Sequence, residues 1–102
     1  MPSYRLLYHP LVVARDIPRL DPPTRKRIRA AIERKLTVHP EAAAKPLAHT
    51  TERLWSLRVG DWRVIFALRD EEIWVLRIGH RRDVYGDRMY RQVPDDLSVS
   101  EP

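Results

Sequence analysis

The chain has 102 residues, enough for one domain with a modest hydrophobic core. Hydrophobic residues make up 43% of it and charged residues 32%, a balance that excludes a disordered chain. The net charge of +5 favours a polyanionic partner such as nucleic acid, and the absence of cysteine excludes disulfides and thiolate metal sites. Because the N-terminus leads into no long apolar run, we expect no signal peptide, no membrane span and a location in the cytoplasm.

The first half of the chain predicts one strand followed by helices. Residues 4–8 are rich in β-forming side chains and precede a proline, which favours a short strand. A helix follows directly and is broken or kinked at Pro18. From Asp21, a good N-cap residue, apolar side chains recur at three- and four-residue spacing up to Leu36, which predicts a second helix. We expect residues 41–53 to form a connector.

Residues 54–66 form two runs of alternating apolar residues joined by a Gly-Asp pair. Gly60 can take the positive φ that a tight hairpin turn needs at its first central position. A two-residue turn places Arg58 directly opposite Arg63. Like charges that face each other across a ladder are destabilising, so we expect an anionic partner at this pair.

A third strand is predicted over residues 73–79, after a turn at 70–72. A two-residue turn would put Arg77 in the core, so we predict a three-residue turn. The face packed on the helices then holds Trp55, Leu57, Val59, Val64, Phe66, Leu68, Trp74, Leu76 and Ile78. The opposite face collects Ser56, Arg58, Arg63, Ile65, Arg77 and, just past the strand, Arg81. The predicted fold is α+β, with an N-terminal strand and two helices on one face of a small, mainly antiparallel four-stranded sheet.

The basic face lies close in sequence to a histidine and a tyrosine, a set that suits phosphodiester chemistry. RNA cleavage by the 2′-hydroxyl needs a base, cations that stabilise the charged phosphorus centre, and an acid for the leaving oxygen. Arg58, Arg63 and Arg81 suit the second need. His80 suits acid or base chemistry, and neighbouring arginines would favour the phenolate of Tyr85, which alternatively packs or stacks on a base. Without a carboxylate cluster or ligand-spaced histidines, we expect no metal and no cofactor.

Two segments carry a specific resemblance to a known family. They are residues 57–66 (LRVGDWRVIF) and residues 75–85 (VLRIGHRRDVY), supported by Lys45-Pro46-Leu47 before the hairpin. Together they resemble the RelE branch of the RelE/ParE toxin superfamily, and the similarity extends over residues 4–91, including the predicted order of strand, two helices and three strands. The resemblance implies a RelE-like fold for a toxin domain at residues 1–92, and the acidic composition of residues 93–102 predicts a flexible tail.

The resemblance also implies a function. Such toxins are paired with an acidic antitoxin in a type II toxin-antitoxin system, and RelE-type members are metal-independent endoribonucleases that cut mRNA in the ribosomal A site through the 2′-hydroxyl. By this resemblance, Arg63 and Arg81 stabilise the phosphate, Tyr85 takes part in proton transfer or base stacking, and His80 matches a basic position. We assign RNA binding to Arg58, Arg77 and Arg82.

Two alternatives stay open at this point. Some relatives carry lysines where this chain has Leu54 and Ser56, so the identity of the general base is open. A ParE-type toxin that inhibits DNA gyrase without nuclease activity shares the fold, and a non-catalytic RNA-binding module fits the charge. The presence of Arg81 and Tyr85 favours the RelE type. We expect the antitoxin to cover the basic face with an acidic helix or extended segment, and a homodimer only within a larger toxin-antitoxin assembly.

Overall fold

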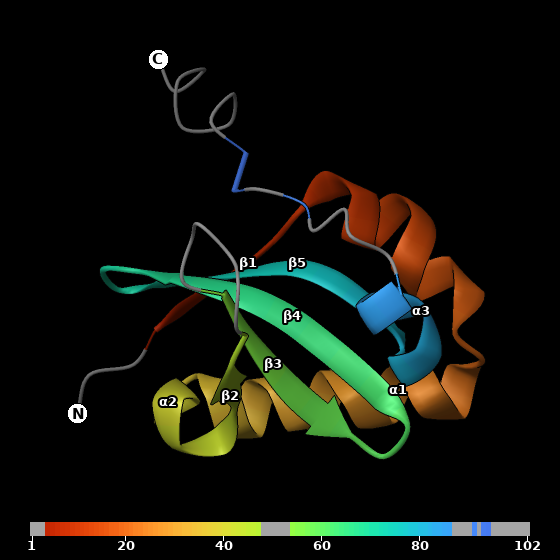
Figure 1. Cartoon of the computed structure of the whole chain (residues 1–102), viewed down its shortest axis with the longest axis horizontal. Helices are drawn as coiled ribbons and strands as arrows, with labels where there is room; N and C mark the ends of the chain where they lie inside the picture. Colours follow the sequence, from red (N-terminus) through yellow and green to blue (C-terminus); the bar gives the residue numbers. More distant parts are fainter. Residues whose placement is uncertain (1–3, 48–53, 87–90, 92, 95–102) are drawn as a thin grey trace.

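The fold is built on one five-stranded sheet with the strand order β1-β5-β4-β3-β2 (Figure 1). The computed structural model describes residues 4–47, 54–86, 91, 93 and 94. The strands are β1 (Arg5–Tyr8), β2 (Lys45–Pro46), β3 (Leu54–Val59), β4 (Trp62–Arg69) and β5 (Glu72–His80). Only β1 and β5 run parallel, so the predicted α+β class and mainly antiparallel sheet are confirmed. The fifth strand, β2, lies in the predicted connector and adds one short edge strand to the four that the sequence predicted.

Helices fill most of the segment between β1 and β2. They are η1 (Val12–Asp16), η2 (Ile17–Arg19), α1 (Pro22–Ala31), η3 (Ile32–Leu36) and α2 (Pro40–Ala43), and α3 (Arg81–Gly86) follows β5. Pro18 lies in the 3₁₀ turn η2, as expected for a residue that breaks a regular helix. Asp21 occupies the N-cap position of α1, although its side chain makes no capping hydrogen bond. Within the described residues, no helix is long and apolar enough to cross a membrane.

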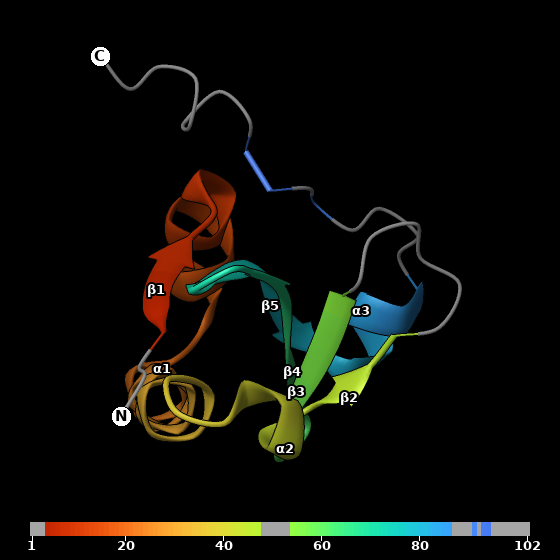
Figure 2. The same ribbon diagram turned by 90° about the vertical axis from the view of Figure 1, so that its left-hand side faces the viewer.

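The main core lies between the helices and one face of the sheet. Figure 2 shows α1 and α2 together on one side of the strands. The segment between β1 and β2 contributes Val12, Leu20, Ile28, Ala31, Ile32 and Leu36 to this core, and the sheet contributes Leu57, Val59, Val64, Phe66, Ile73, Val75 and Ile78. Burial of these apolar side chains is the main source of stability for a chain of this size. The helical stripe and the alternation in β3 and β4 were therefore interpreted correctly.

The predicted three-residue turn between β4 and β5 is wrong. Arg69 pairs with Glu72, which leaves a two-residue turn in which Asp70 has a φ of 53°. The side chains in the first half of β5 consequently point to the faces opposite to those predicted. Trp74 and Leu76 lie in a second apolar cluster on the other face of the sheet, while Ile73 and Val75 pack toward the helices.

A β-bulge restores the predicted alternation farther along β5. Phe66 pairs with Val75 and Ile65 with Arg77, so Leu76 is an extra residue on β5. Such an insertion shifts the following side chains by one position. Ile78 therefore returns to the helix side, and Arg77 lies on the opposite face, where the sequence predicted it, for a different reason.

A buried ion pair binds the backbone of β5 beyond Val75, the last residue of β5 that pairs with β1. The carboxylate of Asp16 accepts hydrogen bonds from the backbone N–H of Ile78 at 2.9 Å and from the two terminal guanidinium nitrogens of Arg91 at 2.7 and 3.0 Å. Arg91 also donates to the carbonyl of Leu76, the bulge residue, at 3.1 Å. The pair thus satisfies backbone groups of β5 and joins η1 to the chain that follows α3. Val93, the first residue of the predicted tail, is buried in the second cluster.

Candidate functional site

The β3–β4 turn brings two arginines together as the sequence predicted. Arg58 lies opposite Arg63, and Gly60 adopts a φ of 62°. The carbonyl oxygen of Gly60 accepts hydrogen bonds from Arg58 Nε and Arg63 Nη1, both at 3.4 Å. Arg63 Nη1 also donates to the carbonyl of Trp62 at 3.2 Å. Backbone dipoles therefore help to hold two like charges side by side at this turn.

The start of α3 is attached to the same turn. The N–H of Arg81 donates to the carbonyl of Asp61 at 2.8 Å, which fixes the end of β5 beside the β3–β4 turn. Arg81 and Arg82 are both exposed. The backbone of Tyr85 lies in α3, whereas its side chain is outside the described part, so its role stays a prediction.

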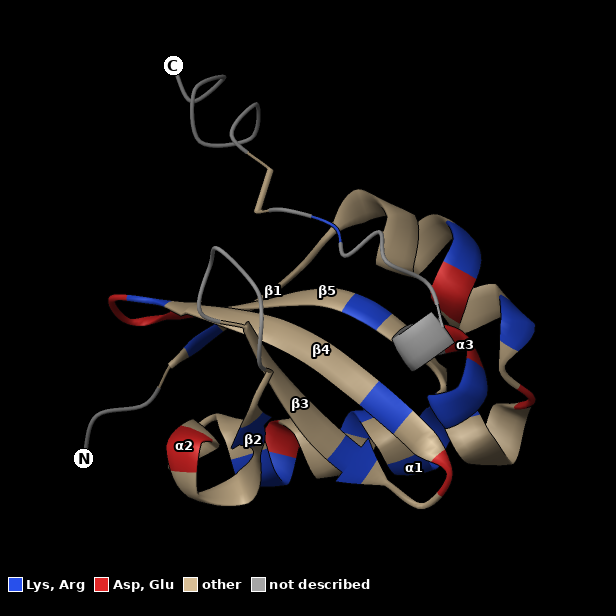
Figure 3. Cartoon of the chain, viewed as in Figure 1, with Lys and Arg blue, Asp and Glu red and all other residues tan. Residues whose placement is uncertain are grey.

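One face of the sheet is divided into a basic end and an apolar end. Arg63 and Ile65 alternate on β4, and Arg77 pairs with Ile65, so the side chains of Arg58, Arg63 and Arg77 share this face. Toward the other end of the sheet the same face holds the second apolar cluster, Leu54, Ile65, Ala67, Trp74, Leu76 and Val93. Figure 3 shows the basic segments of β3, β4, β5 and α3 near the end that carries the β3–β4 turn.

His80 lies at this end of the sheet, on the other face. It pairs with Trp62, and the two rings make an edge-to-face contact with centroids 5.5 Å apart and planes at 78°. Because Trp62 and Arg63 are consecutive in a strand, His80 points away from the arginines of the basic face. Its Nδ1 accepts the N–H of Arg82 at 3.3 Å. The sequence placed His80 in the site through its neighbour Arg81, a proximity that does not fix the face.

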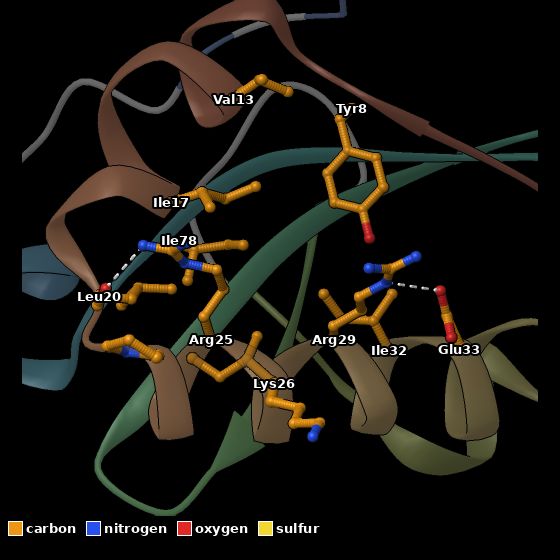
Figure 4. Close-up of a pocket in the computed structure, with 12 residues that line it drawn as sticks. Tyr8, Val13, Ile17, Leu20, Arg25, Lys26, Arg29, Ile32, Glu33 and Ile78 are labelled. Atoms are coloured by element: carbon orange, nitrogen blue, oxygen red, sulfur yellow. Dashed lines mark hydrogen bonds and ion pairs between the residues drawn. The ribbon is translucent and has the colours of Figure 1, made fainter.

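A groove borders the helices on the helix side of the sheet (Figure 4). Its volume is about 500 Å³, and its lining is Tyr8, Val13, Ile17, Leu20, Pro22, Arg25, Lys26, Ile28, Arg29, Ile32, Glu33 and Ile78. Burial raises the pKa of Tyr8, Glu33 raises it further and Arg29 opposes the shift, so the phenol stays protonated. Sequence reasoning missed this groove, although Val13 and Ile17 mark one of its walls by their four-residue spacing.

Among the residues that the structure describes, neither the groove nor the basic face contains a metal site. No group of three or more histidines and carboxylates lies close enough to hold an ion there. The polar groups described at this end of the sheet are guanidinium groups, backbone carbonyls and, on the other face, one imidazole.

Comparison with known proteins bears on the fold and the family of the chain. No curated protein is significantly similar to the sequence. Among solved structures, the toxin-antitoxin complex RelBE2 from Mycobacterium tuberculosis is similar with a TM-score of 0.71 and 25% identity, covering 79% of this chain and 94% of that one. A double mutant of E. coli toxin RelE in the free state has a TM-score of 0.64 and 16% identity, covering 82% and 92%.

A third solved structure, the RelB-RelE antitoxin-toxin complex from Methanococcus jannaschii, has a TM-score of 0.61 and 21% identity, covering 81% of this chain and 98% of that one. These likenesses confirm the RelE-like fold. The family described as "ParE toxin of type II toxin-antitoxin system, parDE" matches residues 6–85. That span begins within β1, ends within α3 and includes β2 to β5 with the β3–β4 turn. The chain therefore belongs to the ParE toxin family of type II toxin-antitoxin systems, within the RelE/ParE superfamily.

Proposed function

We propose that this toxin is a ribosome-dependent endoribonuclease that cleaves mRNA by metal-independent attack of the 2′-hydroxyl. The observation that carries the proposal is the convergence of Arg58, Arg63 and the start of α3 on the β3–β4 turn. Cations fixed before the reaction stabilise the negative charge that develops on the phosphate without a cost of reorganisation. Arg77 and the exposed Arg82 extend this cationic surface for RNA binding.

In this proposal the arginines and the proton-transfer groups have separate tasks. Arg63 and Arg81 stabilise the phosphate, and Tyr85 takes part in proton transfer or base stacking. His80, on the other face at the edge of the site, is a candidate acid or base: its imidazolium form gives a proton to the leaving oxygen and returns to the neutral ring.

The family match supports a second candidate, a ParE-type toxin that inhibits DNA gyrase without nuclease activity. The two candidates differ in what they need from the basic face. A nuclease needs Arg63 and Arg81 at the reacting phosphate, whereas a gyrase inhibitor needs only a complementary protein surface.

In vitro translation with mapped cleavage sites separates the two candidates. We expect the wild-type toxin to cut translated mRNA, and Arg63→Gln or Arg81→Gln to slow cleavage by about 10²–10³-fold, because each removes one stabilising cation. Tyr85→Phe should also lose cleavage, since it removes the phenolic proton. Arg69→Gln, at the opposite hairpin, is the matched control and should cut normally. Intact mRNA together with blocked gyrase supercoiling would establish the ParE-type activity instead.

We also propose an acidic antitoxin as the partner, since two of the similar solved structures are complexes with antitoxins. The groove beside α1 suits apolar side chains of such a partner. Arg25, Lys26 and Arg29 border it, against a single acidic lining residue, Glu33. An amphipathic segment with acidic flanks matches this combination of apolar lining and basic rim. The antitoxin would then contact both the groove and the basic face, and a toxin homodimer would form only within a larger assembly.

A further inference from the structure

Arg27 of α1 lies against the glycine of the β3–β4 turn. A Cβ built on Gly60 would lie 2.9 Å from Nη2 of Arg27, 3.4 Å from its Cζ and 3.5 Å from its Nη1. The guanidinium therefore lies over the site where any other residue would carry its side chain. Gly60 thus has two properties that matter here: its positive φ closes the turn, and its missing side chain lets Arg27 approach.

Four arginine residues from four elements consequently contact one two-residue turn, three of them through the guanidinium group and Arg81 through its backbone N–H. Arg58 and Arg63 donate to the carbonyl of Gly60, the N–H of Arg81 donates to the carbonyl of Asp61, and Arg27 lies beside Gly60 itself. They come from β3, β4, α3 and α1 respectively. A gathering of like charges costs free energy in the unbound protein and favours binding of an anion.

The neighbours of Arg27 on the same helix are engaged elsewhere. Arg25 donates to the carbonyl of Leu20, and Arg29 pairs with Glu33. Arg27 is exposed, and none of the ion pairs formed among the described residues includes it. Its position at the turn is therefore not explained by a carboxylate partner in the described part of the chain.

We propose that Arg27 is an RNA-phosphate-binding residue that continues the basic face around the turn onto α1. This inference rests on the proposed function. Arg63 and Arg77 lie on the face away from the helices, whereas Arg27 reaches the turn from the helix side. An RNA strand that crosses the basic face can therefore keep one more phosphate in contact after it passes the turn. Arginine suits this role because its planar fork binds phosphate through two hydrogen bonds.

Salt-dependent binding of a short single-stranded RNA, made uncleavable by 2′-O-methyl groups, tests the inference. For single strands, log affinity against log salt has a slope of about −0.7 per phosphate contact. We expect Arg27→Gln to reduce the slope by about that amount and to weaken binding several-fold, with an unchanged thermal midpoint. Arg27→Lys should retain the slope, because it keeps the charge. Arg69→Gln, an equal charge change at the far hairpin, should leave binding near the wild-type value.

Arg63→Gln makes failure of the inference distinguishable from failure of the proposed function. If Arg63→Gln lowers the slope while Arg27→Gln behaves like Arg69→Gln, the assignment of Arg27 is overturned and the basic face stands. If none of these variants differs from the wild type, or the wild type binds no RNA at any salt concentration, both are overturned.

Discussion

A hydrogen bond just after the end of β1 depends on the charge state of His9. Its Nδ1 accepts the backbone N–H of Leu11 at 3.0 Å, which requires an unprotonated nitrogen. Burial lowers the pKa of His9, Arg91 lowers it further, and Asp16 opposes the shift. The folded protein therefore favours the neutral ring.

For this reason, the free energy of unfolding should decrease as the pH is lowered. Because the pKa of His9 is lower in the folded state than its ordinary value of about 6.5, protonation favours the unfolded chain. The contribution is present above that ordinary value and is lost as the pH falls through the folded pKa. His9→Asn keeps a short acceptor and removes the titration, so its free energy of unfolding should fall less between pH 7.5 and 5. Urea denaturation measures this, with the exposed His39→Asn as control, and an equal fall in all three proteins would contradict the expectation.

At the scale of elements, the register of the β3–β4 hairpin could be predicted from the sequence, whereas the register of β5 could not. The Gly-Asp pair at 60–61 fixes the turn, and polar residues alternate clearly with apolar ones beside it, so both register and facing were predicted correctly. In contrast, residues 73–76 of β5 are apolar in succession because this central strand is buried on both faces. Such a run carries no alternation, so neither the turn length nor the bulge at Leu76 was visible.

The candidate site was predictable to the same extent as its strands. Arg58 and Arg63 were correctly placed on one face by strand alternation, whereas Arg77 reaches that face only because the bulge at Leu76 compensates for the shorter turn. Arg27 was not foreseen, since no spacing in the sequence relates α1 to a turn more than thirty residues later. His80 was assigned to the site from its neighbour in sequence, and only the pairing with Trp62 shows that it faces the other way.

The Asp16–Arg91 pair should contribute more to stability than a shorter surface pair. Arg91 binds a carboxylate that is only 6% exposed, whereas Arg5 lies 2.6 Å from Glu72 with its own side chain 74% exposed. Removing one partner of a buried pair leaves an uncompensated charge, at a cost of about 3–5 kcal/mol, while an exposed pair contributes at most about 1 kcal/mol.

We therefore expect Arg91→Leu to lower the free energy of unfolding by about 3 kcal/mol and Arg5→Leu by less than about 1 kcal/mol. Combining Asp16→Asn with Arg91→Leu should cost less than the sum of the two single changes, because the stranded carboxylate is then absent. Urea denaturation of the four variants measures these differences. Equal losses for Arg91→Leu and Arg5→Leu would show that burial of the pair has no such effect.

On the scale of the whole molecule, β5 separates two surfaces of different character. Arg77 lies on the basic face, and the adjacent Ile78 lines the groove beside the helices. The bulge at Leu76 sets both orientations at once, because it decides which side chain points to which face. Changes confined to the groove should therefore affect partner binding while leaving RNA cleavage intact.

Val13 and Val38 offer a matched test of the groove. Both are exposed, at 56% and 42%, but only Val13 lines the groove. Val13→Asp places a carboxylate where an apolar side chain of the antitoxin should insert. Binding must then desolvate this carboxylate, which also repels the acidic flanks of the antitoxin. We expect this variant to cleave mRNA normally and to bind the antitoxin at least about tenfold more weakly, a loss of about 1.4 kcal/mol. Val38→Asp introduces the same charge outside the groove and should bind as the wild type does. Calorimetric titration with the antitoxin, together with growth on co-expression, measures both. Equal neutralisation of the two variants would place the antitoxin on another surface.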